Sequence, residues 1–553
     1  MKKRSTILPA LCLLASLYLP GRMQAAEQAP RPVKNIVLMI PDGTSVPVLS
    51  LSRWYRWRVL GGEEKLAVDP YLCGLVKTHC SDSPIGDSAP TTSTYMTGQR
   101  TRTGHVSMYP PQNPDNDIYP VDPERQYQPL TTLAEAGRQL KGKSTGIVFT
   151  CEFPHATPAD VTAHYYDRNA YPVLARQMVH NDIDVVLGGG TAFLTPEYKK
   201  VLEQRKTTVL TDDPAGMRRF QGNKLWALFG AKAQPYDLDR DTSRVPSLAE
   251  MTRKALSILS QNENGFFLMV EGSKVDWAAH ANDPMGMITE FLAFDEAVRE
   301  AMLFARTDGE TLVVVVPDHG NSGISIGNRS LSHGYDTLPL ERLLEPFRHF
   351  RTTAQGMADR MNIDPTDSLR PLFRRLLNID LTDAEVDSLY RSRDYRNSPL
   401  PPRQRDNRPL QYRVGDIMSS RTLLGFTTNG HTGEDVFLAA YHPQGDIPRG
   451  LLTHVELNAY LTRQFGLEGA LDSLTAENFV SHRDVFRGMD CRIEPAGSAS
   501  MLTVKGGKGM LTISGNTDTA RLNGKEIRLG TLAVYVDRND TFYVPRRLRK
   551  LLE

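Results

Sequence analysis

The chain has 553 residues, and its 65 Lys and Arg residues nearly balance its 64 Asp and Glu residues. This length is enough for a large hydrophobic core or for more than one domain. The balanced charge gives no indication of a nucleic-acid partner. An apolar fraction of 40% is ordinary for a water-soluble globular protein.

The first 26 residues have the pattern of a secretory signal peptide. Basic residues at the start precede an apolar stretch from Ile7 to Pro20, and Ala25 and Ala26 follow it. That stretch is too short to cross a bilayer, and no later run is long and apolar enough to do so. We therefore predict a signal peptide at residues 1–26, no membrane span, and a soluble mature protein that is periplasmic or secreted.

Four cysteines, Cys73, Cys80, Cys151 and Cys491, remain after removal of such a peptide. An oxidising compartment would allow three full pairings among them. Cys73 and Cys80 could not bridge directly if they end an extended strand, because they would be about 23 Å apart. No CxxC or Cys/His zinc spacing occurs, so we expect the cysteines to be structural at most.

Six short apolar runs are continuous rather than alternating. Such runs are typical of strands that are buried on both faces of a mostly parallel sheet. They cover residues 35–40, 144–150, 184–189, 265–270, 311–316 and 435–441.

Helical patterns lie between these runs. In residues 247–261, Ser247 and Glu250 predict a capping box at the start of a helix. Residues 283–305 give a second helical pattern, with Pro284 near its start. The alternation predicts an α/β fold in which helices flank both faces of a mostly parallel central sheet.

Two segments interrupt the alternation. Residues from about 322 to 425 combine helical patterns with a polar, proline-rich stretch, so we expect a helical or loop insertion there. Its arginines indicate a solvated surface, and a rim that attracts anionic substrates is the alternative. They include Arg374, Arg375, Arg391, Arg393, Arg396, Arg403, Arg405 and Arg408. Further on, short β patterns alternate with Gly and Asn turns, which predicts a small β module at 490–553 after a catalytic domain at 27–489.

The stretch PIGDSAPTTSTYMTGQ, residues 84–99, allows two interpretations. In one, Asp87 or Ser88 caps a helix and the hydroxyl groups bond to water or nearby backbone. In the other, Ser88 is a nucleophile at a helix N-terminus, where backbone amides and the helix dipole favour an anion. By itself the stretch favours a cap, because caps far outnumber nucleophiles.

Carboxylates and histidines gather where the predicted strands end, which is the edge at which open α/β sheets bind ligands. Each of them alone could be a capped turn or a histidine with ordinary partners. Several carboxylates at one edge would repel one another unless protons or cations offset their charge. Carboxylate and imidazole ligands without a thiolate suit zinc in a catalytic site. The candidates are Asp42, Glu271, Asp276, His280, Asp318, His319 and His431.

Six separated motifs occur in a fixed order: PDG, GDSAPTTS, HATPADVTAHYYDR, EGSKVDWAAH, VPDHG and NGHTGED. Together they resemble the alkaline phosphatases, over a region from about residue 33 to residue 482. The agreement of six motifs makes the resemblance specific, although the arginine-rich insertion and the terminal β module lie outside it. All six motifs precede residue 490, so we expect turnover not to depend on the module.

The resemblance implies two zinc ions and one magnesium ion beside a serine nucleophile. The implied zinc ligands are Asp276, His280 and His431 for one ion, and Asp42, Asp318 and His319 for the other. The implied magnesium ligands are Asp42, Thr157 and Glu271.

The resemblance also implies that Ser88 forms a phosphoserine intermediate and that Arg168 clamps two phosphate oxygens. The planar guanidinium fork of arginine suits that task. His155 and Trp277 differ from the best-known bacterial pattern, which has an acidic residue and a lysine there. This difference leaves the occupancy of the third metal site open.

The implied substrates are small-molecule phosphate monoesters, and a homodimer is a state that the resemblance leaves open. A metal-dependent phosphodiesterase would usually carry threonine as its nucleophile and lack the third-metal residues. A cofactor-independent phosphoglycerate mutase shares the metal chemistry, but an exported chain would not meet glycolytic substrates. A phosphate- or wall-binding protein without activity would require vestigial ligands, and all of the implied ligands are present.

Overall fold

The computed structural model describes residues 31–363, 369–393, 409–497 and 499–553. The predicted signal peptide lies outside these residues, as do Arg396, Arg403, Arg405 and Arg408 of the insertion. Residues Pro32–Glu553 form one compact unit. Among the described residues, none of the helices combines the length and the apolar character that a membrane crossing needs.

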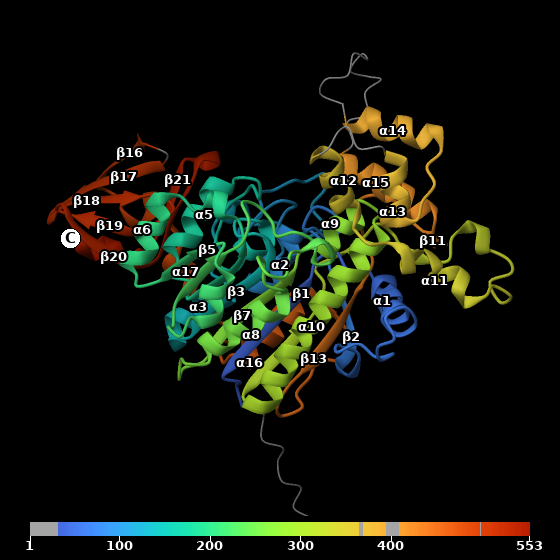
Figure 1. Cartoon of the computed structure of the whole chain (residues 1–553). Helices are drawn as coiled ribbons and strands as arrows, with labels where there is room; N and C mark the ends of the chain where they lie inside the picture. Colours follow the sequence, from blue (N-terminus) through green and yellow to red (C-terminus); the bar gives the residue numbers. More distant parts are fainter. Residues whose placement is uncertain (1–30, 364–368, 394–408, 498) are drawn as a thin grey trace, which may run out of the picture. The chain divides into compact units, whose positions relative to one another are not determined.

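A ten-stranded sheet forms the centre of this unit (Figure 1). Neighbouring strands are parallel except at β13, which is antiparallel to both β8 and β2. In spatial order the strands are β14 (Gly450–Thr453), β2 (Leu72–Lys77), β13 (Val436–Tyr441), β8 (Thr311–Val315), β1 (Asn35–Pro41), β7 (Phe266–Gly272), β3 (Ser144–Glu152), β4 (Val185–Gly189), β6 (Leu225–Leu228) and β5 (Thr208–Thr211). All six apolar runs are strands of this sheet, so the predicted α/β fold with a mostly parallel sheet is confirmed.

Four of the ten strands are absent from the sequence prediction. β14 and β5 are the two edges of the sheet, and β2 and β6 lie next to them. β2 and β14 carry mostly half-exposed or exposed side chains, and β5 is half-exposed. An edge strand buries less apolar surface and therefore lacks the continuous apolar run that identified the central strands. This reason does not apply to β6, which is fully buried and apolar but only four residues long.

Two hydrophobic cores lie on opposite faces of the sheet, because successive side chains of β1 point to opposite sides. Val37 and Met39 join one core, whereas Ile36, Leu38 and Ile40 join the other. The first core is completed by α1 (Val46–Arg58), α8 (Leu248–Leu259) and α10 (Pro284–Asp308). The second is completed by α2 (Ser88–Thr97), α3 (Leu133–Lys141), α5 (Tyr171–His180) and α16 (His454–Gln464). Helices on both faces are thus confirmed.

The two predicted helix starts are present, with one correction. Ser247 Oγ accepts a hydrogen bond from the Glu250 amide at 3.1 Å, so it caps α8. The Glu250 carboxylate does not complete a capping box, because it accepts hydrogen bonds from Arg218 instead. α10 begins at Pro284, and Asp283 accepts from the next amides.

Short strand pairs bracket the arginine-rich insertion. β9 (Gly320–Asn321) pairs with β12 (His431–Thr432), and inside this pair β10 (Ser325–Ile326) pairs with β11 (Leu424–Gly425). Between them lie α11 (Leu340–His349), α12 (Ala354–Ile363), α13 (Leu369–Leu377), α14 (Asp383–Arg393) and α15 (Leu410–Ser420). β12 is followed in the chain by β13, so the β9–β12 pair returns the chain from the insertion to the main sheet.

A seven-stranded antiparallel sheet lies at the C-terminal end of the chain, drawn in orange-red to red in Figure 1. Its spatial order is β15 (Val480–Ser481), β21 (Thr541–Val544), β20 (Lys525–Val536), β19 (Thr517–Leu522), β18 (Gly509–Ser514), β17 (Ala499–Gly506) and β16 (Asp490–Ala496). The expected C-terminal β module is therefore present. The four cysteines that the structure describes, Cys73, Cys80, Cys151 and Cys491, are free thiols.

Candidate active site

Three carboxylates lie at the C-terminal ends of the central strands, and therefore along one edge of the sheet. Asp42 follows β1, Glu271 lies near the end of β7, and Asp318 follows β8. β1 is parallel to both neighbours, and Ile40 pairs with Glu271, so these strand ends are level. Gly43 has a φ of +61°, and a Cβ atom there would lie 2.4 Å from Asp276 Oδ1. Glycine is therefore required for the PDG turn to pass this close to the cluster.

The first group consists of Asp42, Asp318 and His319, all fully buried. His319 Nε2 lies 3.5 Å from Asp42 Oδ1 and 3.4 Å from Asp318 Oδ2. Neither oxygen of the Asp42 carboxylate has a hydrogen-bond partner, and Asp318 Oδ2 also lacks one. Burial, together with repulsion from Asp318, raises the pKa of Asp42 well above its usual value. Such a site strongly favours a bound cation.

The second group consists of Asp276 and His280 on α9 (Lys274–His280) and His431 on β12. His280 Nε2 lies 3.4 Å from Asp276 Oδ2 and 3.2 Å from His431 Nε2. The other ring nitrogen of each histidine contacts a backbone carbonyl. His280 Nδ1 lies 2.6 Å from Asn429 O, and His431 Nδ1 lies 3.0 Å from Gly86 O. Backbone contacts of this kind fix the tautomer, leaving both Nε2 atoms as lone-pair donors for a metal.

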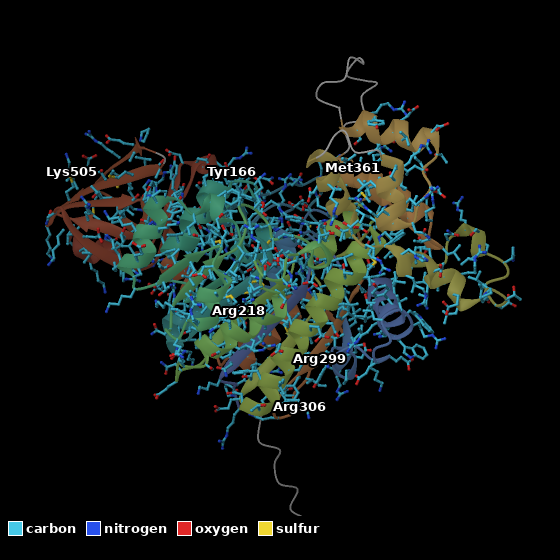
Figure 2. All side chains as sticks on the ribbon, in the orientation of Figure 1. Tyr166, Arg218, Arg299, Arg306, Met361 and Lys505 are labelled. Atoms are coloured by element: carbon cyan, nitrogen blue, oxygen red, sulfur yellow. The ribbon has the colours of Figure 1, made fainter. Side chains whose placement is uncertain are left out.

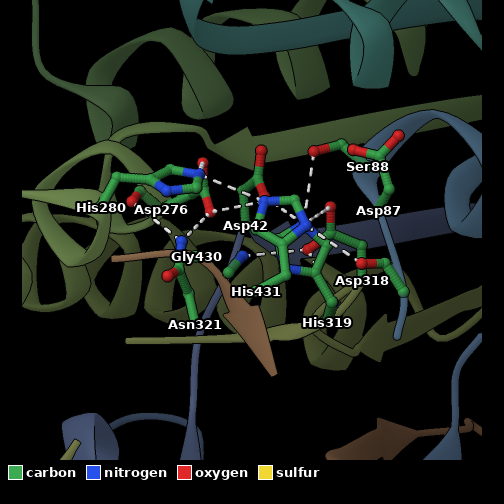
Figure 3. Close-up of polar contacts among 12 residues, drawn as sticks. Asp42, Asp87, Ser88, Asp276, His280, Asp318, His319, Asn321, Gly430 and His431 are labelled. Carbon is green, nitrogen blue, oxygen red and sulfur yellow. Dashed lines mark hydrogen bonds and ion pairs between the residues drawn. The ribbon is translucent and has the colours of Figure 1, made fainter. Parts of the chain in front are cut away.

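The two groups adjoin one another (Figure 3). The rings of His319 and His431 are stacked with centroids 3.7 Å apart. Ligand atoms of Asp276, His319 and His431 lie within 4.8 Å of one another, so His319 is within reach of both groups. Asn321, from β9, donates to Asp276 Oδ1 at 2.7 Å and orients that carboxylate. Burial opposes ionisation of Asp276, but the neighbouring imidazoles of His280, His431 and His319 lower its pKa.

Ser88 is the first residue of α2, a helix whose residues are all buried. Its Oγ lies 3.4 Å from His319 Nε2, which places the hydroxyl at the border of the first group (Figure 3). Asp87 occupies the N-cap position, but its side chain makes no capping hydrogen bond. Its carboxylate instead accepts from the Gly104 amide at 3.2 Å and from Arg168. The capping interpretation therefore does not describe the Asp87 side chain.

Arg168 lies in the loop that precedes α5. Its Nη1 donates to Asp87 Oδ1, and its Nη2 lies 3.4 Å from His155 Nε2. Burial of Asp87 opposes ionisation, but the Arg168 guanidinium holds the pKa of that carboxyl below its usual value. Burial, and to a smaller extent the positive charge of Arg168, lower the pKa of His155 to about 3, so this imidazole is neutral. The His155 ring packs edge-on against Trp277 with centroids 5.8 Å apart.

A third group lies around Glu271. Ligand atoms of Cys151, His155 and Glu271 are within 4.8 Å of one another. The Cys151 thiol donates to Glu271 Oε2 at 3.4 Å, whereas Glu271 Oε1 and Thr157 Oγ1, on α4 (Ala156–Ala159), are buried without a partner. Burial raises the pKa of Glu271 to about 8. The resemblance implied Thr157 and Glu271 at a third metal, and the thiol is an addition that the sequence did not predict.

A family model described as Alkaline phosphatase matches residues 33–464. The chain belongs to the alkaline phosphatase family. Alkaline phosphatase 3 of Bacillus subtilis is 30% identical over 454 residues, which cover 79% of this chain and 90% of that protein. The repressible alkaline phosphatase of Saccharomyces cerevisiae is 27% identical over 484 residues, covering 78% of this chain and 80% of its own. The resemblance inferred from the six motifs is confirmed, and the chain is an enzyme of this family.

Solved structures of alkaline phosphatases have the same fold. The Thermus thermophilus enzyme matches 83% of this chain and 96% of its own with a TM-score of 0.67 and 25% identity. A cold-active enzyme from a Shewanella species matches 78% of this chain and 99% of its own with a TM-score of 0.65 and 25% identity.

The structure brings every predicted site residue of this alkaline phosphatase to one edge of the sheet, while their individual roles stay predictions. Three residues were missed: Asp87 as the partner of Arg168, Asn321 as the donor to Asp276, and Cys151. Cys151 directly follows the predicted strand run at 144–150, so its position at a strand end was a usable signal. Asn321 had no such signal, because only the β9–β12 pairing brings it to the site.

Proposed function

We propose that this alkaline phosphatase hydrolyses phosphate monoesters through a phosphoserine intermediate on Ser88, at a site that binds two zinc ions and a third cation. The observation that carries the proposal is the position of Ser88 Oγ, 3.4 Å from His319 Nε2. This nitrogen in turn lies 3.5 Å from the buried carboxylate of Asp42, whose oxygens have no hydrogen-bond partner. A nucleophile next to uncompensated negative charge needs cations before it can approach a phosphate dianion.

The donor set supports zinc at the first two positions. It offers three imidazole nitrogens and three carboxylates, which zinc accepts in catalytic sites. Asp276, His280 and His431 would hold one ion, and Asp42, Asp318 and His319 the other. Two such ions would stabilise the attacking and leaving oxygens and lower the pKa of the nearby serine hydroxyl.

The protein groups then have defined tasks. Ser88 Oγ attacks phosphorus and the bond to the alcohol oxygen breaks, so that the phosphate remains on Ser88 and the serine proton ends on the released alcohol. Attack by water on this phosphoserine releases inorganic phosphate and restores the hydroxyl. Arg168 would hold two phosphate oxygens, which its planar fork allows. Asp87 orients the guanidinium, since it binds Nη1 from the position next to Ser88.

The third position has a mixed donor set. The oxygens of Asp42, Thr157 and Glu271 suit magnesium, as the resemblance implies. The imidazole of His155 and the thiol of Cys151 suit zinc better. The third cation is therefore magnesium or zinc according to how many of these atoms bind it. Comparison of the magnesium and zinc contents of wild-type and Cys151→Ser protein tests the contribution of the thiol.

The test of the function combines metal analysis with two substrates. We expect two zinc ions per chain, or three where zinc also binds at the third position, and turnover of p-nitrophenyl phosphate far faster than that of bis(p-nitrophenyl) phosphate. Chelation should abolish activity, and zinc should restore it better than magnesium alone. Preference for the diester would favour a phosphodiesterase, whereas bound zinc without any turnover would favour a phosphate-binding protein. Full recovery with magnesium alone would contradict the assignment of zinc.

The proposal extends to export and assembly. The basic and apolar pattern of residues 1–26 supports secretion to the periplasm or the medium. Cell fractionation with N-terminal sequencing of the mature protein tests this, and retention of residue 1 in the cytoplasm would contradict it. A homodimer stays a prediction, which sedimentation of the mature protein would test.

A further inference from the structure

The C-terminal sheet contacts the loop that carries Arg168. The turn Asp537–Asn539 joins β20 to β21, and we call it the hairpin tip. Tyr165 OH donates to Asp537 Oδ1 at 2.9 Å. The guanidinium carbon of Arg538 lies 5.1 Å from the ring centroid of Tyr166, a residue labelled in Figure 2. Both tyrosines precede Arg168 by only a few residues, so the hairpin tip contacts the segment that would bind phosphate.

A shared apolar cluster supports this contact. The cluster joins strands β20 and β21 of the C-terminal sheet to residues that precede this sheet in the chain. Its buried members are Met108, Phe479, Leu532, Val534, Val536 and Tyr543, and Tyr127 and Tyr166 pack against them. Removal of the C-terminal sheet would expose the buried side chains of Met108 and Phe479 to water, which is unfavourable. The expectation that turnover is independent of the module stays a prediction, and the packing joins the module to Tyr166 of the Arg168 loop.

Backbone hydrogen bonds link the contact to the phosphate-binding groups. Tyr165 and Val106 form two backbone hydrogen bonds with each other, of 2.8 and 2.9 Å. Arg168 N donates to Gly104 O at 2.8 Å, and Gly104 N donates in turn to Asp87 Oδ2 at 3.2 Å. The loops 104–108 and 164–168 thus form a frame that holds Arg168 and Asp87. The hairpin tip contacts this frame at Tyr165.

We infer that Asp537 is a positioning residue that fixes the Arg168 loop through Tyr165, so that the C-terminal sheet contributes to phosphate binding. The inference rests on the proposed role of Arg168. A two-pronged contact to phosphate requires placement within about 0.5 Å, which a loop attains only when its neighbours hold it. The hydrogen bond to Asp537 and the apolar cluster provide this support from the C-terminal sheet.

The test uses full-length protein with Asp537→Ala and, separately, Tyr165→Phe. Each variant should raise KM for p-nitrophenyl phosphate and weaken inhibition by inorganic phosphate by the same factor, about two- to tenfold. The turnover number and the zinc content should stay near wild type. Arg528→Ala is the matched control, because it removes a module ion pair to Asp518 that does not contact the Arg168 loop. It should leave KM unchanged.

Double variants separate positioning from general loosening. In an Arg168→Ala background, Asp537→Ala should have no further effect on KM or on phosphate inhibition, because the group it positions is gone. An additive effect in that background, or unchanged KM in both single variants, would overturn the inference. If Arg168→Ala itself leaves phosphate inhibition unchanged, the proposed function of Arg168 fails. The two failures are therefore distinguishable.

Discussion

Two buried aspartates of this enzyme have opposite surroundings. Asp518, on β19 of the C-terminal sheet, has a side chain that is 6% exposed and lies 2.5 Å from Arg205 and 2.9 Å from Arg528. Asp42, at the end of β1, is fully buried, and both of its carboxylate oxygens lack a hydrogen-bond partner. In the C-terminal sheet, arginines therefore offset the charge of the buried carboxylate, whereas no hydrogen-bond partner does so at the end of β1.

The pKa values of the two groups diverge accordingly. Burial opposes ionisation of Asp518, but His180 and the two arginines lower its pKa below the usual range. At Asp42, burial and neighbouring carboxylates act in the same direction and raise the pKa. A buried carboxylate that protein cations neutralise stabilises the fold, whereas one without such cations indicates a binding site for a cation from outside. Four predictions test this division between fold and function.

The largest expected effect is on Ser88. Ser88→Ala should lower monoesterase turnover by several orders of magnitude, because the attacking oxygen is removed while every proposed zinc ligand remains. Zinc content and thermal stability should stay near wild type. Thr92→Val is the control, since it removes a hydroxyl group from the same buried helix where that hydroxyl has no hydrogen-bond partner. Near-wild-type turnover in Ser88→Ala would remove the basis of the proposed mechanism.

The second effect concerns Arg168, the proposed site residue that binds no metal. Arg168→Ala should lower kcat/KM by about ten- to several-hundredfold, a loss of about 1.4 to 3.5 kcal/mol, mostly through a higher KM. Inhibition by inorganic phosphate should weaken in parallel. Arg168→Lys should recover only part of the loss, because an ammonium group keeps the charge without the fork. An unchanged KM together with unchanged phosphate inhibition would show that Arg168 does not bind substrate.

The metal-free enzyme should lose stability as pH rises from about 4.5 to about 8. The pKa of Glu271 is raised by burial from its ordinary value of 4.5 to about 8. In this window the folded state retains a proton that the unfolded state has released, so the free energy of unfolding falls with increasing pH. Thermal melts of chelated protein across this range check the direction. Glu271→Gln should flatten the profile, and an identical profile in that variant would assign the pH dependence elsewhere.

The smallest effect concerns the C-terminal sheet. Asp518→Asn should lower the free energy of unfolding by about 1 to 2 kcal/mol, because Arg205 loses its buried charge partner. Turnover per folded molecule should not change. Denaturant unfolding and activity of the same samples provide the measurement. A loss of turnover that exceeds the loss of folded protein would contradict the separation of the two aspartates.

Most of the site could be predicted from the sequence because several of the motifs lie at the ends of central strands. Asp42, Glu271 and Asp318 could be grouped from their sequence positions alone, since parallel strands end at the same edge of a sheet. The contacts of Asp87 and Asn321 could not be predicted. Asp87 binds Arg168 instead of capping α2, and Asn321 donates to Asp276, only because segments far apart in sequence are packed together. The contact between Tyr165 and Asp537 was unpredictable for the same reason.

The position of β1 has a consequence for synthesis. It is the first strand among the described residues, yet Ile36 pairs with Phe267 on one side and Leu312 on the other. A ribosome adding roughly 5–20 residues per second needs tens of seconds to deliver those partners. Throughout that interval the apolar segment of β1 stays without its neighbours and is prone to aggregate. The centre of the sheet can therefore form around β1 only after β7 and β8 have been made.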